Sequence, residues 1–291
     1  MPALVDALRA AFQRGLHAPA RNVHRLSDSA SLLLMPAWDN KQQLGVKLVQ
    51  VDTARSPAVA ASYLFLDAAS GDLKAVIDGA MLTARRTAAA SALAADFLAR
   101  ADASTLAILG TGVLAPHFAE AHAAVRPIDK VLIWGRDPER AAHVAALVRR
   151  TGMRADVAAD ATEAAASADI VSCVTSASTP VLQGADLRPG THVDLVGAFR
   201  PDMREADDAV FADATIYVDT FEGALEEAGD LLHAINAGVL TVADIRGELA
   251  TLCRGEAPGR SSPGEITVFK SVGTSLEDLA CAELIVARQD C

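Results

Sequence analysis

The sequence predicts an α/β protein in which a doubly wound parallel sheet is joined to a second, α+β domain. An apolar run at 106–109 leads through a glycine-rich turn and a helical segment to a second run at 130–134. Further short runs, separated by helical segments, follow at 169–175, 191–196, 215–219 and 265–269, which is typical of a parallel sheet. The first 80 residues instead place apolar runs between short turns, at 32–35, 45–51, 62–67 and 73–77, and so predict an antiparallel or mixed sheet.

Helices complete both domains. Leu4, Leu8, Phe12 and Leu16 recur every four residues, which predicts an amphipathic helix over 3–16. A long alanine-rich helix is expected from about 83 to 100, with a hinge at 102–104. Other helices are expected at 116–125, 138–150, 160–168, 221–229, 231–236 and 275–288, with a long loop at 251–264. Ser275 and Asp278 have the spacing of a capping box at the start of the last helix.

Composition excludes several classes of protein. The formal charge of −11 argues against nucleic-acid binding, and no apolar run reaches the roughly 18 residues of a membrane span. The N-terminus lacks a basic segment before an apolar stretch, so we expect no signal peptide and a cytoplasmic location. The histidines show no ligand spacing, so no metal site is expected. The four cysteines are expected to be free thiols: Cys173, Cys253, Cys281 and Cys291.

Gly110, Gly112 and Ala115 form the pattern Gly-x-Gly-x-x-Ala directly after the run at 106–109. Gly110 permits a tight turn, Gly112 lets a pyrophosphate approach the backbone, and Ala115 lets the next helix pack closely on the sheet. A glycine-rich turn without a ligand is the alternative. The strand–helix–strand context favours a Rossmann dinucleotide-binding domain with the phosphates at the helix N-terminus.

The end of the second strand bears on the choice of cofactor. Enzymes that prefer NAD usually carry an acidic residue there, which binds the ribose 2′-hydroxyl. This chain has Gly135 at that position and then Arg136, which favours the 2′-phosphate of NADP, while Asp137 keeps NAD as the alternative.

Lys47 lies inside a predicted strand and shares a face with Val49 and Val51. Desolvation on such a face favours a neutral lysine, which suits a proton donor or acceptor. The alternative is an edge-strand lysine that reaches solvent.

Arg85 and Arg86 fall in the expected first turn of the alanine-rich helix, where the helix dipole disfavours cations. Two arginines there indicate an anion site that one of them faces; two solvated arginines are the alternative. Arg21 has no informative local pattern.

The motifs together resemble those of the ornithine cyclodeaminase/mu-crystallin family over nearly the whole chain. The matching segments are 44–49, 78–89, 109–113, 196–205, 227–230 and 268–273. The resemblance implies a homodimer whose subunits pair a Rossmann domain, 103–273, with a substrate and dimerisation domain, 1–102, completed by the helix at 274–291.

The resemblance also implies residue roles. Lys47 matches the family's catalytic lysine, and Arg86 and Arg21 match arginines that bind the substrate carboxylate. The segments near Ser176 and Ser271 match those beside the nicotinamide. The expected cofactor-binding residues are Gly110, Thr111, Gly112, Val113, Leu114, Gly135, Arg136, Thr175, Ser176, Ala177, Val196, Gly197, Ser271 and Gly273.

One departure bears on the reaction. Cyclodeaminases in the family carry an aspartate where this chain has Phe199, whereas the segment 200–205 has the form of the mu-crystallin-like and imine-reductase branches. We therefore expect an NAD(P)H-dependent reductase that converts a cyclic ketimine carboxylate, Δ1-pyrroline-2-carboxylate or Δ1-piperideine-2-carboxylate, to the L-imino acid. Ornithine cyclodeamination, a dinucleotide-dependent small-ligand binder without activity, and acyclic substrates such as pyruvate with ammonia or methylamine are the alternatives.

Overall fold

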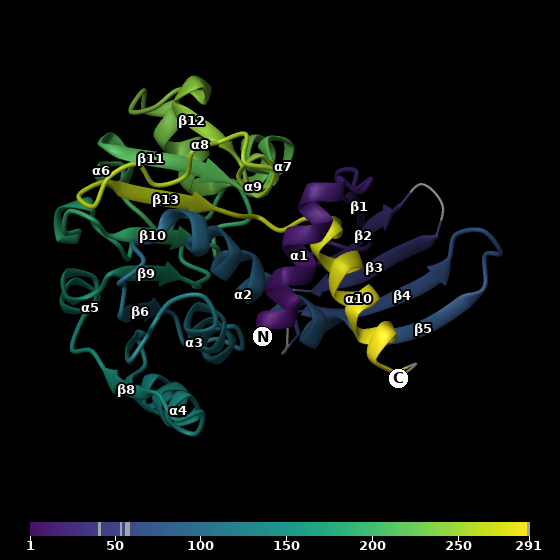
Figure 1. Cartoon of the computed structure of the whole chain (residues 1–291), viewed down its shortest axis with the longest axis horizontal. Helices are drawn as coiled ribbons and strands as arrows, with labels where there is room; N and C mark the ends of the chain where they lie inside the picture. Colours follow the sequence, from purple (N-terminus) through teal and green to yellow (C-terminus); the bar gives the residue numbers. More distant parts are fainter. Residues whose placement is uncertain (40–41, 53, 56–58, 290–291) are drawn as a thin grey trace. The chain divides into compact units, whose positions relative to one another are not determined.

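The computed structural model describes residues 1–39, 42–52, 54–55 and 59–289; Cys291 lies outside these ranges. The chain divides into two compact units (Figure 1). We call Met1–Pro2 with Ala88–Val272 the parallel-sheet unit, and Ala3–Thr87 with Gly273–Cys291 the antiparallel-sheet unit. The division falls inside the long helix α2 (Gly79–Leu98), whereas the sequence predicted a boundary at 102/103. The end of α2 belongs with the parallel sheet because the carbonyl of Leu98 accepts hydrogen bonds from Arg260 and Thr267.

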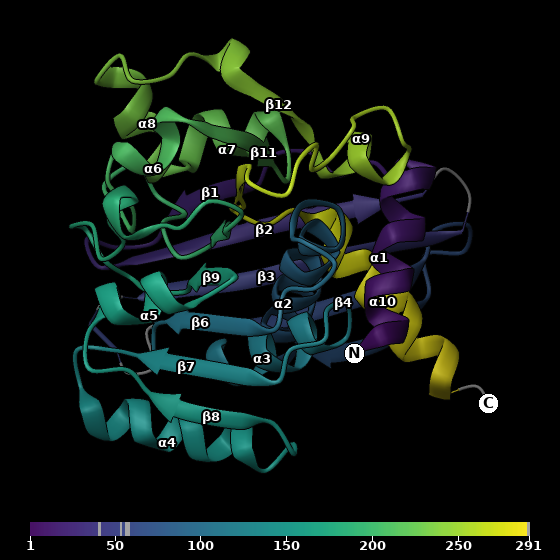
Figure 2. The same cartoon turned by 60° about the vertical axis from the view of Figure 1, so that its left-hand side comes forward.

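Eight parallel strands form the larger sheet, in the order β12-β11-β13-β10-β9-β6-β7-β8. They are β6 Thr105–Leu109, β7 Lys130–Trp134, β8 Arg154–Val157, β9 Ile170–Cys173, β10 His192–Leu195, β11 Ala214–Val218, β12 Ile245–Glu248 and β13 Ile266–Lys270. The chain starts at β6, runs outward through β7 and β8, and then crosses to β9 on the other side (Figure 2). This reversal beside β6 confirms the doubly wound sheet, and such switch points are where open α/β sheets bind ligands.

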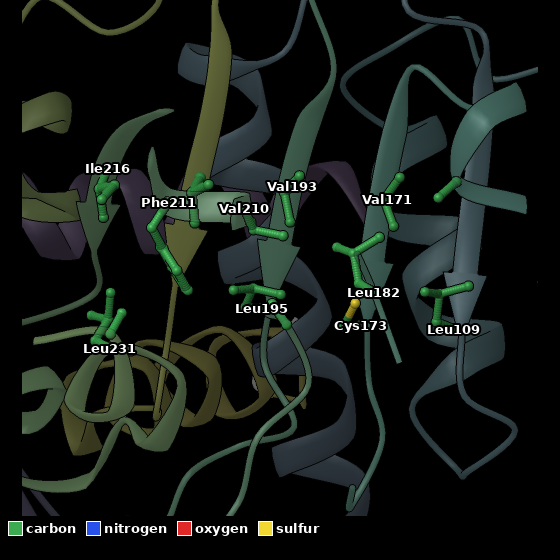
Figure 3. Packing of buried hydrophobic residues seen from close by; sticks show 14 of the residues in the cluster. Leu109, Val171, Cys173, Leu182, Val193, Leu195, Val210, Phe211, Ile216 and Leu231 are labelled. Carbon is green, nitrogen blue, oxygen red and sulfur yellow. The ribbon is translucent and has the colours of Figure 1, made fainter. Parts of the chain in front are cut away.

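Helices connect these strands. They are α3 Ala115–Ala123, α4 Pro138–Arg149, α5 Ala161–Ser167, α6 Ala209–Ala212, α7 Phe221–Glu227, α8 Gly229–Asn236 and α9 Leu249–Cys253, with single turns η1 Gly184–Asp186 and η2 Val242–Asp244. One face of the sheet carries an apolar cluster in which Val171, Val193 and Leu195 meet Phe211 of α6 and Leu231 of α8 (Figure 3). Because these alternate strand residues are buried, the pairing register of the strands is fixed. The positions of the loops at the carboxyl ends of the strands follow from that register.

The antiparallel-sheet unit orders its five strands β1-β2-β3-β4-β5. They are β1 Asn22–Arg25, β2 Ala30–Trp38, β3 Gln43–Asp52, β4 Val59–Asp67 and β5 Leu73–Asp78. Two helices accompany the sheet: α1 (Pro2–Arg14) and α10 (Ser275–Gln289), which lie side by side and are joined by an ion pair between Arg14 and Glu283 (Figures 1 and 2). On the face below α10, Lys47 pairs with Met35 on one side and Tyr63 on the other.

The sequence reading missed several short elements. The edge strands β8 and β12 were not predicted, and the long loop expected at 251–264 begins with the end of α9. The segment 21–36 holds two strands, β1 and the start of β2, and α6 was also missed. Edge strands such as β8 are largely exposed, so they show no apolar run.

Cys173, Cys253 and Cys281 are buried free thiols. Within the described ranges, none of the helices combines the length and the apolar character needed to cross a membrane.

Candidate active site

The turn between β6 and α3 has the geometry of a phosphate site. Gly110 has φ +135°, and a Cβ there would lie 2.6 Å from the carbonyl oxygen of Val174. A Cβ on Gly112 would meet open space among the described residues, and Val113 is exposed. Leu114 is the N-cap residue of α3 and has no acceptor in its side chain, so no side-chain cap competes with an anionic ligand at this helix N-terminus. The first-turn N–H groups of Ala115 and His117 donate to the carbonyls of Gly112 and Leu114, so the turn before the helix is the part that a phosphate would approach. These residues fit the pyrophosphate of a dinucleotide.

The end of β7 lies next to this turn. A Cβ on Gly135 would lie 2.5 Å from Cγ2 of Thr111, so glycine lets the two segments approach. Arg136 is exposed. The carboxylate of Asp137 caps α4, because it accepts hydrogen bonds from the backbone N–H groups of Glu139 (3.0 Å) and Arg140 (3.3 Å). The acidic residue is thus engaged within the protein, while the neighbouring arginine projects from the strand end.

The other predicted cofactor residues follow three strands of the same sheet. Thr175, Ser176 and Ala177 come after β9, Val196 and Gly197 after β10, and Ser271 after β13. Carboxyl ends of parallel strands share one edge, and that edge is where such sheets bind ligands. Gly273 follows Ser271 by two residues and is the first residue of the C-terminal part of the antiparallel-sheet unit.

Lys47 is 2% exposed and ion-paired. Its Nζ lies 2.9 Å from Oδ1 and 2.8 Å from Oδ2 of Asp278, which belongs to the first turn of α10. The pKa of Lys47 is lowered to about 8: burial has the largest effect, Asp278 opposes it, and Arg86 and Arg21 add to it. The alternative of an edge lysine that reaches solvent is wrong, because β3 is a central strand and α10 lies over this face.

Arg86 is 4% exposed and faces the same carboxylate. Its Nε donates to Oδ1 of Asp278 at 2.9 Å, and its Nη1 donates to Glu277. Burial disfavours the charge, but Asp278 and Glu277 raise the pKa of Arg86 above its ordinary value. Arg85 is half-buried. The helix-dipole argument for this pair rested on a wrong start: α2 begins at Gly79, so both arginines lie beyond its first turn.

Arg21 directly precedes β1 and belongs to the same unit as Lys47 and Arg86. Its Nη2 donates a 2.8 Å hydrogen bond to the carbonyl of Gly273. Gly273 has φ +82°, and a Cβ there would lie 2.5 Å from Nη1 of Arg86. The structure therefore brings Arg21, Lys47, Arg86 and Gly273 together in one unit.

Sequence reasoning missed Glu277 and Asp278 as members of this site. The spacing of Ser275 and Asp278 was interpreted as a capping box, but both side chains have other partners. Ser275 Oγ donates to the carbonyl of Pro36 at 2.6 Å, and Asp278 binds Lys47 and Arg86. The available signal was the pair of adjacent acids in a helix start that is otherwise apolar.

The cluster suits an anionic substrate that accepts a proton. Lys47 and Arg86 share the carboxylate of Asp278, and Arg21 reaches the same unit through the carbonyl of Gly273, so a buried proton donor and two arginines come together. Phe199, at the position where the cyclodeaminase pattern has an acid, is 42% exposed. Across the described part of the chain, no three His, Cys, Asp or Glu side chains are placed to hold a metal ion.

Known proteins share this architecture. The family profile described as "Ornithine cyclodeaminase/mu-crystallin family" matches residues 1–290. A Δ1-pyrroline-2-carboxylate reductase from Paracoccus denitrificans is 40% identical over 275 residues, which cover 92% of this chain and 86% of that protein. The ketimine reductase mu-crystallin of Rattus norvegicus is 38% identical over 277 residues, which cover 93% of this chain and 85% of that protein.

Two solved structures have the same fold as this chain. The Δ1-pyrroline-2-carboxylate reductase of Thermococcus litoralis, in complex with NADH and L-proline, superposes with a TM-score of 0.93 at 32% identity, over 98% of this chain and 92% of that one. An archaeal alanine dehydrogenase dimer with bound NAD has a TM-score of 0.92 at 27% identity, over 99% and 92% of the two chains.

Proposed function

The chain belongs to the ornithine cyclodeaminase/mu-crystallin family and is an NAD(P)H-dependent reductase, and we propose that it acts on a cyclic ketimine carboxylate. The substrate would be Δ1-pyrroline-2-carboxylate or Δ1-piperideine-2-carboxylate, and the product L-proline or L-pipecolate. The observation that carries this proposal is the buried Lys47, with a pKa of about 8, which shares the carboxylate of Asp278 with Arg86 and lies in the same unit as Arg21.

Each residue then has a defined task. Arg86 and Arg21 hold the substrate carboxylate and so fix the orientation of the C=N bond. Lys47, protonated below pH 8, donates its proton to the imine nitrogen, and the lysine is later reprotonated from solvent. The bound nicotinamide supplies the hydride that C2 accepts, so that the C=N double bond becomes a C–N single bond with one new C–H and one new N–H bond.

NADPH is the proposed preferred donor. The two related structures hold NADH and NAD, so the preference rests on this chain's own residues. Gly135 replaces the expected acid, and Asp137 caps α4 with both of its observed hydrogen bonds. The exposed Arg136 is left as the charged group for a ribose 2′-phosphate.

We further propose a homodimer that forms through the outer face of the antiparallel sheet. Leu64 and Val46 form a cross-strand pair on this face, opposite to Lys47, and Val76 extends the row onto β5. Val76 is 65% exposed and Leu73 55%. Apolar rows on a sheet face are typical of a protein interface, and a related alanine dehydrogenase is a dimer.

The decisive experiment follows oxidation of NADPH and NADH with Δ1-pyrroline-2-carboxylate, for wild type and for Lys47→Ala. We expect rapid oxidation by wild type and a loss of at least about 100-fold in kcat for the variant, because general acid catalysis typically contributes 10²–10⁴-fold. Lys74→Ala is the matched control, since Lys74 is a lysine of β5 in the same sheet with a 48% exposed side chain. Full turnover by Lys47→Ala would show that Lys47 is not the proton donor. Ammonia release from L-ornithine by wild type, with no imine reduction, would replace the proposed reaction by cyclodeamination.

A further inference from the structure

A buried carboxylate ties together two of the strand ends that the cofactor-binding residues follow. Glu205 is 0% exposed. Its Oε1 accepts hydrogen bonds from the backbone N–H (2.6 Å) and hydroxyl (2.8 Å) of Thr175, just after β9. Its Oε2 accepts from the N–H groups of Gly197 (2.6 Å) and Ala198 (3.2 Å), just after β10. One side chain thus sets the distance between two loops.

A second buried carboxylate extends the link to a third strand. Oδ1 of Asp230, in α8, accepts from the backbone N–H groups of Glu205 (2.6 Å) and Ala206 (3.0 Å). Oδ2 of Asp230 accepts from Nζ of Lys270 at 3.0 Å. Lys270 is the last residue of β13 and directly precedes Ser271. Glu205, Asp230 and Lys270 are all 0% exposed, and we call them the buried triad.

Two glycines leave the space that the buried triad needs. A Cβ on Gly197 would overlap the carbonyl oxygen of Thr175 and Oε1 of Glu205. A Cβ on Gly229 would overlap the carbonyl oxygen of Met203, which lies two residues before Glu205. The backbone therefore approaches the carboxylates on both sides, as expected where a loop position is tightly fixed.

The hydrogen-bond donors around Glu205 favour its anionic form. All four of its partners are donors in the observed arrangement, and a charged acceptor makes stronger hydrogen bonds than a neutral one. Burial raises the pKa of Glu205 to about 7, and Lys270 opposes this shift. A glutamine at this position would turn an amide N–H₂ group toward other donors.

The buried triad lies at the carboxyl ends of β9, β10 and β13, where the sheet is expected to bind its dinucleotide. A dinucleotide with its pyrophosphate at the β6–α3 turn and its adenosine half toward β7 must extend its other half across the switch point toward β9 and β10. We propose that Glu205 is a positioning residue for the nicotinamide half of the cofactor: with Asp230 and Lys270 it holds the segments after β9, β10 and β13 that receive it. This inference rests on dinucleotide binding and is independent of the imine substrate.

The test compares two ligands on the intact protein. Calorimetry measures the Kd of NADPH and of 2′-phospho-ADP-ribose, which lacks the nicotinamide ring, for wild type and Glu205→Gln. We expect Glu205→Gln to weaken NADPH binding at least about tenfold and to leave the affinity for 2′-phospho-ADP-ribose within about twofold. NADH and ADP-ribose form the equivalent pair if the chain prefers NAD. No imine is present, so an error in the proposed substrate does not affect the result.

Asp169→Asn is the matched control. Asp169 is also a carboxylate that accepts two backbone N–H bonds, from Ser104 and Thr105, but it lies before β9 at the opposite sheet edge. It should lower Tm and leave both Kd values unchanged. Asp230→Asn, which keeps an acceptor for the backbone of Glu205 but removes the charge that pairs with Lys270, should weaken NADPH binding in the same selective way and decides the matter if Glu205→Gln does not fold. Equal loss for both ligands, or no loss, in the variant that decides would overturn the proposal.

Discussion

Asp278 is the counter-ion that Lys47 and Arg86 share. One oxygen of its carboxylate lies 2.9 Å from the lysine Nζ and 2.9 Å from the arginine Nε. The side chain is 0% exposed, so its charge acts on both cations with little screening by water. At this scale a single carboxylate orients the proposed proton donor and one proposed carboxylate-binding group.

The first prediction concerns the pH dependence of turnover. The pKa of Lys47 is lowered to about 8 by burial and by the charges of Arg86 and Arg21. The charge of Asp278 acts in the opposite direction and raises this pKa. Without the carboxylate, the pKa of Lys47 falls further. Asp278→Asn should therefore lose activity at a lower pH than wild type, since Lys47 must be protonated to donate; the measurement is the pH profile of kcat.

The two variants Asp278→Glu and Asp278→Asn separate the effect of charge from the effect of stability. Asp278→Glu keeps the charge, so its basic limb should stay near that of wild type. Asp278→Asn also removes the carboxylate that pairs with the buried Lys47 and leaves Arg86 its contact with Glu277, and breaking a buried ion pair typically costs about 3–5 kcal/mol of unfolding free energy. The profile is therefore recorded below the Tm of the variant. A basic limb at the wild-type pH would show that Lys47 is not the titrating acid.

At the scale of elements, the β7–α4 connection combines two functions in three residues. Gly135 allows close approach to Thr111, Arg136 stays exposed, and Asp137 caps the helix. The cap stabilises α4, typically by about 1 kcal/mol, and it uses Oδ1 of Asp137, which supports our proposal that Arg136 rather than this acid contacts the adenosine ribose. Local helix chemistry here bears directly on the choice of cofactor.

The second prediction tests that connection. Arg136→Ala should raise the KM for NADPH about 10- to 100-fold, because hydrogen bonds to charged groups contribute about 1.5–3 kcal/mol, and should leave the KM for NADH nearly unchanged. Arg150→Ala is the control, since Arg150 is an exposed arginine at the other end of α4. Equal changes in both KM values would refute a role of Arg136 in 2′-phosphate binding.

At the scale of the whole molecule, the outer face of the antiparallel sheet carries two rows of exposed or partly exposed apolar side chains. Leu44, Leu66 and Leu73 form a second row beside the row of Val46, Leu64 and Val76. The formal charge of −11 makes close association of two copies unfavourable unless the contact itself is apolar. We propose that this face provides such a contact.

The third prediction is the oligomeric state. Wild type should scatter light as a particle of twice the 30.2 kDa mass of one chain. Val76→Lys places a charge on the exposed end of the row and should shift the mass toward the monomer, with little change in the Tm measured at concentrations where wild type is also monomeric. Val157→Lys, on the exposed edge strand β8, is the control and should remain a dimer. A monomeric wild type would contradict the proposed interface.

The sequence alone determined the framework of this protein. Apolar runs of four to seven residues, separated by helical periodicity, predicted the parallel sheet, and the glycine pattern predicted a phosphate site at the β6–α3 turn. Alternation along β3 put Lys47 on the face with Val49, as the structure confirms. These features are local, so a short window of residues contains the whole signal.

Only the tertiary structure decided which side chains meet. Asp278 is separated from Lys47 by 231 residues and from Arg86 by 192, and its spacing to Ser275 pointed to a local cap instead. Glu205 likewise reaches Thr175 across 30 residues, through a glycine that leaves it room. Buried charges are fixed by the partners that compensate their desolvation, and those partners come from distant parts of the chain; no local pattern could assign them.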